Sequence, residues 1–251
     1  MLRRLALSAL FVAGAALAGG ARSTAAPAAV DSLHLVRVVP LPVREPSDLC
    51  LDRDGEHLWT VSDRTGLVYE LRLSDLGVER TLRYHGTDPE GIWQNPADGT
   101  FFVTEEKSRQ IVHLDKRGKV LGRVSVAGLG GDANSGLEGI TSGPVTGSFY
   151  VTQEKRPARL VVTDTAGTVL ATYAVGYASD LSGVTRDPRT GQPVLVSDES
   201  HEVCWVTPAA ELVKAWAIPV SKAEGVAIDT LRGRVYVVSD REERFYEFRL
   251  P

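Results

Sequence analysis

The chain is poor in cysteine, histidine and aromatic residues. Its 251 residues include 2 cysteines and 5 histidines, and aromatic side chains make up 7%. Two cysteines without a nearby histidine cluster do not make a zinc site. The formal net charge is -4, so no basic surface for nucleic acid is indicated and we expect no nucleic-acid partner.

Long apolar runs are also scarce, and one stands out at the N-terminus. Two arginines, Arg3 and Arg4, precede an apolar stretch from Leu5 to Ala18, and small residues follow up to Ala21. This order is typical of a secretory signal, and the stretch is short for a membrane span. We therefore expect a signal peptide over residues 1–21, a linker over 22–31 and a periplasmic or secreted protein. The alternative is an uncleaved N-terminal anchor, which would be the chain's contact with a membrane.

An internal repeat dominates the rest of the sequence. Five units begin at residues 47, 90, 138, 182 and 224, and each holds short β-rich runs separated by turn residues. A spacing of about 42 to 48 residues is that of one four-stranded propeller blade. The repeat predicts an all-β fold, a five-bladed β-propeller over residues 32–251. A β-sandwich is the alternative, but it does not explain five equal units.

The two ends of the repeat are complementary. The fifth unit ends after three β-rich runs, and an unassigned run from Leu33 to Val39 precedes the first unit. We predict that this N-terminal strand completes the last blade, because closure removes an open sheet edge. Cys50 and Cys204 then fall in blades that are not neighbours. They should lie too far apart for a disulfide and remain free thiols.

Carboxylates recur at two places in the repeat that should meet at the mouth of the central channel. Seven of the ten residues assigned to these places are acidic. Such crowding favours a hard cation with oxygen ligands, and we predict calcium. The best ligand candidates are Glu90, Glu138 and Glu224, with Asp63, Glu105, Asp198 and Asp240 beside them. At the start of the inner strand stand Ser47, Glu90, Glu138, Ser182 and Glu224; at the end of the second strand stand Asp63, Glu105, Gln153, Asp198 and Asp240. The next position adds Glu106, Glu154 and Glu199.

A purely structural role is the alternative for these residues. A glutamate at a strand start can accept hydrogen bonds from backbone amides of the adjacent blade, and aspartates at strand ends shape turns. The glycines that follow the glutamates can serve close packing near the axis. His85 and His201 are expected in loops on the carboxylate face, where they are weak candidates for a catalytic base.

Short motifs at the starts of the repeat units resemble those of the SdiA-regulated family of bacterial exported propellers. The resemblance rests on Pro46-Ser47-Asp48-Leu49, Asp88-Pro89-Glu90-Gly91-Ile92, Gly136-Leu137-Glu138-Gly139-Ile140-Thr141 and Ala223-Glu224-Gly225-Val226-Ala227. It implies a five-bladed propeller after an N-terminal apolar segment, with a calcium site and no established activity. Ser47 and Ser182 interrupt a uniform glutamate ring, so we expect an off-axis site that uses two or three blades.

A more distant resemblance is to calcium-dependent propeller lactonases and esterase-like phytases, which place acidic residues and calcium at a propeller mouth. The histidine and asparagine pattern of those enzymes is not evident, although Asn134 is placed on the same face. Two functions follow. One is a calcium-binding module whose channel mouth takes a small ligand or an envelope protein. The other is a calcium-dependent hydrolase of a lactone or phosphoester, with His85 or His201 as base.

Overall fold

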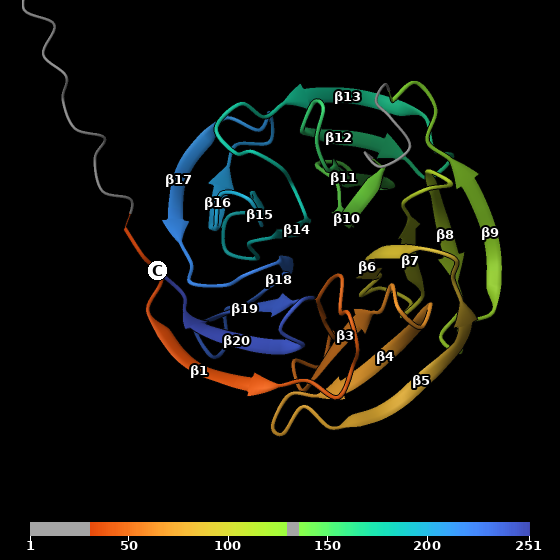
Figure 1. The fold of residues 1–251 in the computed structure, drawn as a ribbon. Coiled ribbons are helices and arrows are strands. Elements are labelled where there is room, and N and C mark those ends of the chain that lie inside the picture. Colours follow the sequence, from red (N-terminus) through yellow and green to blue (C-terminus); the bar gives the residue numbers. More distant parts are fainter. Residues whose placement is uncertain (1–30, 130–135) are drawn as a thin grey trace, which may run out of the picture.

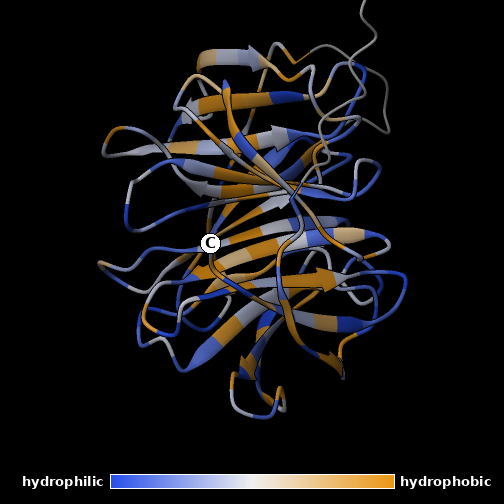
Figure 2. Ribbon diagram, turned by 90° about the vertical axis from the view of Figure 1, so that its left-hand side faces the viewer, coloured by the Kyte–Doolittle hydropathy of each residue, from blue (hydrophilic) through white to orange (hydrophobic). Residues whose placement is uncertain are grey.

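The computed structural model describes residues 31–129 and 136–251. In these residues the chain forms five four-stranded antiparallel sheets arranged as a ring around a central axis (Figure 1). The strands carry most of the apolar residues, whereas the connecting turns are mostly polar (Figure 2). The five-bladed propeller predicted from the repeat is confirmed.

Each blade runs from an inner strand at the axis to an outer strand at the rim. The first consists of β2 (Cys50–Leu51), β3 (His57–Val61), β4 (Leu67–Arg72) and β5 (Val78–His85), and the second of β6 (Pro89–Gln94), β7 (Phe101–Glu105), β8 (Gln110–Leu114) and β9 (Val120–Ser125). The third consists of β10 (Leu137–Ser142), β11 (Ser148–Gln153), β12 (Arg159–Asp164) and β13 (Val169–Ala174), and the fourth of β14 (Gly183–Arg186), β15 (Pro193–Ser197), β16 (Glu202–Val206) and β17 (Leu212–Ala217).

The last blade is assembled from both ends of the repeat. It consists of β18 (Ala223–Asp229), β19 (Arg234–Ser239), β20 (Arg244–Arg249) and, outermost, β1 (Leu35–Pro40). β1 pairs antiparallel with β20, with Val38 opposite Tyr246 and Pro40 opposite Arg244. The predicted closure is therefore confirmed. Before β1, Ser32 forms a parallel bridge to Ala217, so the segment that leads into β1 contacts the fourth blade.

The hydrophobic core is divided into five clusters, each between two neighbouring blades. Alternating strand residues face one neighbour or the other, because successive side chains of a strand point to opposite faces. Between the first two blades, Trp59 packs edge-on against Phe101 with ring centroids 4.5 Å apart. Each blade therefore buries both of its faces against its two neighbours in the closed ring.

Glycine is required where the inner strands approach one another. A Cβ at Gly91 would lie 2.5 Å from the backbone oxygen of Glu138, and one at Gly139 would lie 2.5 Å from the backbone nitrogen of Val184. A side chain at either position would therefore force neighbouring blades apart. The predicted packing role of these glycines is confirmed.

Both cysteines are free, as predicted. Cys204 is buried and Cys50 is half-buried, and burial raises the pKa of each thiol to about 12. No helix in the described residues has the length and apolar character of a membrane span. The predicted signal peptide or anchor and nearly all of the predicted linker lie outside the described residues, as does Asn134.

Candidate functional site

The inner strands bring one set of side chains to the same end of the channel. We call Ser47, Glu90, Glu138, Ser182 and Glu224 the strand-start set. Glu90, Glu138 and Glu224 are the second residues of β6, β10 and β18. For four members of the set, the preceding residue pairs with the second strand of the same blade. These pairs fix the register between the inner strand and the second strand. The pairs are Pro46 with Ser62, Pro89 with Glu105, Leu137 with Gln153 and Ala223 with Ser239.

This register corrects the second set. Because Ser62, Glu105, Gln153 and Ser239 occupy equivalent positions, the residues equivalent to Asp63 and Asp240 come one place after Glu105 and Gln153. The predicted equivalence of Glu105 and Gln153 with Asp63 is therefore wrong by one residue. The strand-end set consists of Asp63, Glu106, Glu154, Asp198 and Asp240, and all five are acidic. A one-residue slip matters because it moves a side chain to the opposite face of the strand.

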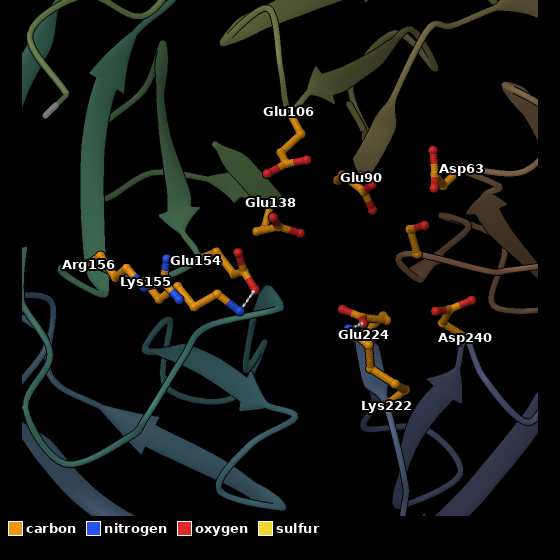
Figure 3. Close-up of a pocket in the computed structure, with 11 residues that line it drawn as sticks. Asp63, Glu90, Glu106, Glu138, Glu154, Lys155, Arg156, Lys222, Glu224 and Asp240 are labelled. Atoms are coloured by element: carbon orange, nitrogen blue, oxygen red, sulfur yellow. Dashed lines mark hydrogen bonds and ion pairs between the residues drawn. The ribbon is translucent and has the colours of Figure 1, made fainter. Parts of the chain in front are cut away.

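Eight of the ten residues of the two sets line a cavity of about 410 Å³ at one end of the channel, which we call the acidic mouth. Figure 3 shows carboxylates from four blades pointing into it. In the part of the chain that the structure describes, seven acidic and three basic side chains line it: Asp63, Glu90, Glu106, Glu138, Glu154, Glu224, Asp240, Lys155, Arg156 and Lys222. Ser47 completes the lining. The fourth blade's Ser182 and Asp198 are not among the lining residues.

Glu138 is the most buried carboxylate of the strand-end and strand-start sets, at 7% exposure. Among the described residues, no hydrogen-bond donor or cation contacts its carboxylate. Burial, followed by repulsion from Glu90 and Glu224, raises its pKa well above the usual range. A carboxylate in this position must either keep its proton or have a cation beside it.

The acidic residues gather in two groups on adjacent blades. Oxygen atoms of Glu106, Glu138 and Glu154 lie within 4.8 Å of one another, as do those of Asp63, Asp88 and Glu90. Burial raises the pKa of Glu90 well above its usual range, and repulsion from Asp63 and Glu224 adds to this effect. Both groups offer the closely spaced oxygen ligands that a hard cation binds.

Part of this negative charge is already neutralised by lysines. Lys222 lies 2.9 Å from Glu224 and 3.8 Å from Asp198. Burial raises the pKa of Glu224 to about 7, although Lys222 opposes the increase. Lys155 pairs with Glu154 at 2.6 Å, and Lys107 pairs with Asp88 at 2.8 Å.

Asp240 is less well compensated. Its Oδ1 is enclosed and has no hydrogen-bond partner in the described part of the chain. Burial raises its pKa despite the nearby Lys222.

Glu105 has a different environment from the acidic mouth. Its carboxylate accepts hydrogen bonds from the Tyr84 hydroxyl and from the backbone nitrogens of Thr87 and Asp88, the latter two at 3.0 and 3.1 Å. The equivalent serines also bond the loop before the inner strand, as in Ser62 to Arg44 O and Ser239 to Ser221 O. Glu105 thus holds the loop that carries Asp88 and does not line the cavity.

The two histidines also lie outside the cavity lining. His85 ends β5 opposite Leu67, and it is exposed. The Nδ1 atom of His201 lies 2.9 Å from the backbone oxygen of Val220. Neither is positioned on the carboxylates of the acidic mouth.

Sequence reasoning missed several residues in or beside the mouth, including Lys155 and Arg156 of its lining. Asp88 and Lys222 stand two places before Glu90 and Glu224, so an alignment of the residues before the strand-start set would have found them. Asp48 occupies the place that is glycine in the other four units. It is fully buried, and its carboxylate accepts hydrogen bonds from the backbone nitrogens of Leu49 and Ile92 at 2.8 and 2.9 Å. Asp48 therefore joins the first two blades at the axis.

Comparison with solved structures supports the fold. The chain is similar to hydrazine synthase of Kuenenia stuttgartiensis, with a TM-score of 0.52 and 17% sequence identity. The match covers 79% of this chain and 56% of that chain, so this chain corresponds to little more than half of its length. At this identity the similarity concerns the fold alone.

Comparison with family models gives a match over most of the chain. The SdiA-regulated model matches residues 37–249, which run from β1 to the end of β20. The match therefore includes all five blades and the strand that closes the ring. The chain belongs to the SdiA-regulated family.

Proposed function

We propose that this protein is an exported calcium-binding propeller that serves as a binding module of the periplasm or cell envelope. A small ligand or an envelope protein would engage the acidic mouth. The observation that carries the calcium proposal is Glu138. Glu138 lines the cavity and is only 7% exposed, and no donor or cation of the described residues contacts its carboxylate.

The donor set fits calcium. Calcium takes six to eight oxygen ligands at about 2.3–2.6 Å in flexible geometry, and carboxylates are its usual protein ligands. Glu106, Glu138 and Glu154 bring oxygens within 4.8 Å of one another from two adjacent blades. Lys155 already pairs with Glu154, so a cation there would compete with this ion pair. A bound calcium would supply a positive charge where the blades meet and offer its remaining positions to a ligand.

Calcium binding is testable with chelator-treated protein. A ligand that binds only the folded state stabilises it by about 2.7 kcal/mol at a hundredfold excess over its dissociation constant. For a domain of this size, calcium should raise the melting temperature by about 5–10 °C. Magnesium should do less, because it demands octahedral geometry and gives up water reluctantly. Calorimetric titration should show saturable calcium binding.

Two matched variants locate the site. Glu138→Gln keeps the shape of the side chain and should abolish most of the calcium response. Glu211→Gln removes the same charge from an exposed position outside the cavity and should leave the response unchanged. If both variants respond like the wild type, calcium does not bind at Glu138. If the wild type takes up no calcium at millimolar concentration, the metal proposal is wrong.

Export is testable separately. Protein recovered from the producing cells should fractionate with the periplasm or envelope, and its N-terminus should begin near Arg22. An intact Met1 on membrane-bound protein would support the anchor instead. Recovery of the intact chain in the cytosol would contradict the proposal.

A further inference from the structure

A second cavity of about 410 Å³ lies at the opposite end of the inner strands, and we call it the second mouth. The acidic mouth is lined by residues near the starts of these strands, whereas the second mouth is lined by residues near their ends. All five inner strands contribute, through Leu51, Trp93, Thr141, Arg186 and Ile228 among others. The volume is within the range of small-molecule sites, at about 300–1,000 Å³. Of the described residues, none lines both this cavity and the acidic mouth.

The wall of the second mouth is partly apolar and rigid. Trp93 packs against Phe102 and Phe149, with ring centroids 5.8 Å away in both cases. Ile228 and Ala227 are buried on the last inner strand, and Leu51 is half-buried on the first. An aromatic ring that is held by its neighbours offers contact area at little entropic cost when a flat ligand binds.

Two arginines give this cavity a positive character. Arg53 is exposed, and its guanidinium has no hydrogen bond or ion pair with the described residues. Arg186 is held by bonds from Nε to Gly191 O and from Nη1 to Ser142 Oγ, at 2.9 and 3.2 Å. Those bonds fix the plane of the guanidinium and leave its Nη2 without a protein acceptor in the described residues. Among the described residues, Asp187 is the one acidic residue of the lining, and Arg189 neutralises it at 2.7 Å.

One hydroxyl adds a polar group to the lining. Thr141 is 4% exposed and lines the cavity, and its hydroxyl has no hydrogen-bond partner among the described residues. An open hydroxyl in a cavity can bond a polar atom of a ligand. This observation is independent of the two arginines.

We propose that the second mouth binds a small organic anion with a flat apolar body. The anionic group lies toward Arg53 and Arg186, since planar guanidinium groups favour carboxylates and phosphates. The apolar body packs on Trp93, and Thr141 bonds a polar atom of the ligand. This site does not depend on calcium or on the acidic mouth.

The probe is 2-naphthoate, titrated into the purified chelator-treated protein by calorimetry and by tryptophan fluorescence. We expect saturable binding, and about tenfold weaker binding for Arg53→Gln, the effect of losing one charged hydrogen bond. Arg83→Gln removes an exposed arginine of β5 outside the cavity and should bind like the wild type. Thr141→Val, which keeps the shape and removes the hydroxyl, should weaken binding several-fold.

Two more titrations test the charge of the ligand and the location of its site. The uncharged 2-naphthamide should bind at least tenfold more weakly than 2-naphthoate; equal binding would overturn the assignment of an anion. Glu138→Gln should bind 2-naphthoate unchanged, whereas loss of binding would place the ligand at the acidic mouth. The proposal is also overturned if the wild type shows no binding at millimolar 2-naphthoate, or if Arg53→Gln and Arg83→Gln bind equally. None of these outcomes depends on whether calcium binds.

Discussion

Asp187 and Glu138 are both buried carboxylates at an end of the same central channel, but their partners differ. Asp187 in the second mouth is fully buried and contacts Arg189 and the Trp205 indole nitrogen at 2.7 and 3.0 Å. Burial acts to raise its pKa, but these hydrogen bonds outweigh burial and lower it. Glu138 has no such donor among the described residues, so burial raises its pKa. Burial alone therefore does not decide the charge of a carboxylate; its donors do.

The same contrast extends to the two mouths. Within residues 31–129 and 136–251, the charged side chains that line the acidic mouth are seven acidic and three basic ones, and those that line the second mouth are two arginines and one aspartate. The inner strands run between them, and three of these strands, β6, β10 and β18, carry a glutamate near the start. One propeller therefore offers a site suited to a cation and a site suited to an anion, separated by the packed inner strands.

Opening the ring is the change with the largest expected effect on both mouths. A chain that begins at residue 42 lacks β1 and leaves the edge of β20 unpaired, and it also loses the buried Leu33 and Leu41. We expect aggregation or loss of cooperative thermal unfolding, because every blade needs both neighbours. A chain that begins at residue 31 is the control and should melt like the longer protein. Equal melting of the two truncated chains would contradict closure by β1.

The fold could be predicted from sequence because the same pattern of β-rich runs and turns recurs in all five units. The complementary ends, a missing strand after Phe248 and an unassigned one at Leu33, also identified the closing strand. These features depend on strand length and turn spacing, which the sequence records directly. The unpaired state of Cys50 and Cys204 followed from blade order alone.

The site was predicted less completely because it depends on register. Glu105-Glu106 and Gln153-Glu154 each offer two polar residues at a strand end, and composition does not say which one faces the channel. Strand alternation does contain the answer. Phe101 and Val103 lie in the cluster shared with the first blade, so Glu105 belongs to that face and Glu106 to the other. The role of Asp48 depends on its contact with Ile92 in the next blade, which no single repeat encodes.

The pH dependence of stability distinguishes the acidic mouth from the rest of the molecule. The pKa of Glu224 is raised from 4.5 to about 7 in the folded protein. The folded state therefore binds this proton more tightly than the unfolded state, and stability falls as pH rises from about 4.5 to 7. A shift of this size corresponds to about 3 kcal/mol, and the raised pKa values of Glu90 and Glu138 act in the same direction.

We therefore expect chelator-treated protein to be more stable to urea at about pH 5.5 than at about pH 8. Glu224→Gln cannot ionise at this position, so it should flatten the profile and gain stability relative to the wild type at the higher pH. Glu211→Gln, an exposed change outside the cavity, should keep the wild-type profile. Asp187 contributes nothing to this trend, because its lowered pKa makes stability fall only under more acidic conditions. Two outcomes would contradict this prediction: wild-type stability that rises from about pH 5.5 to 8, or a Glu224→Gln profile like that of the wild type. Either would show that hydrogen bonds or cations compensate the carboxylates of the acidic mouth, as they do Asp187.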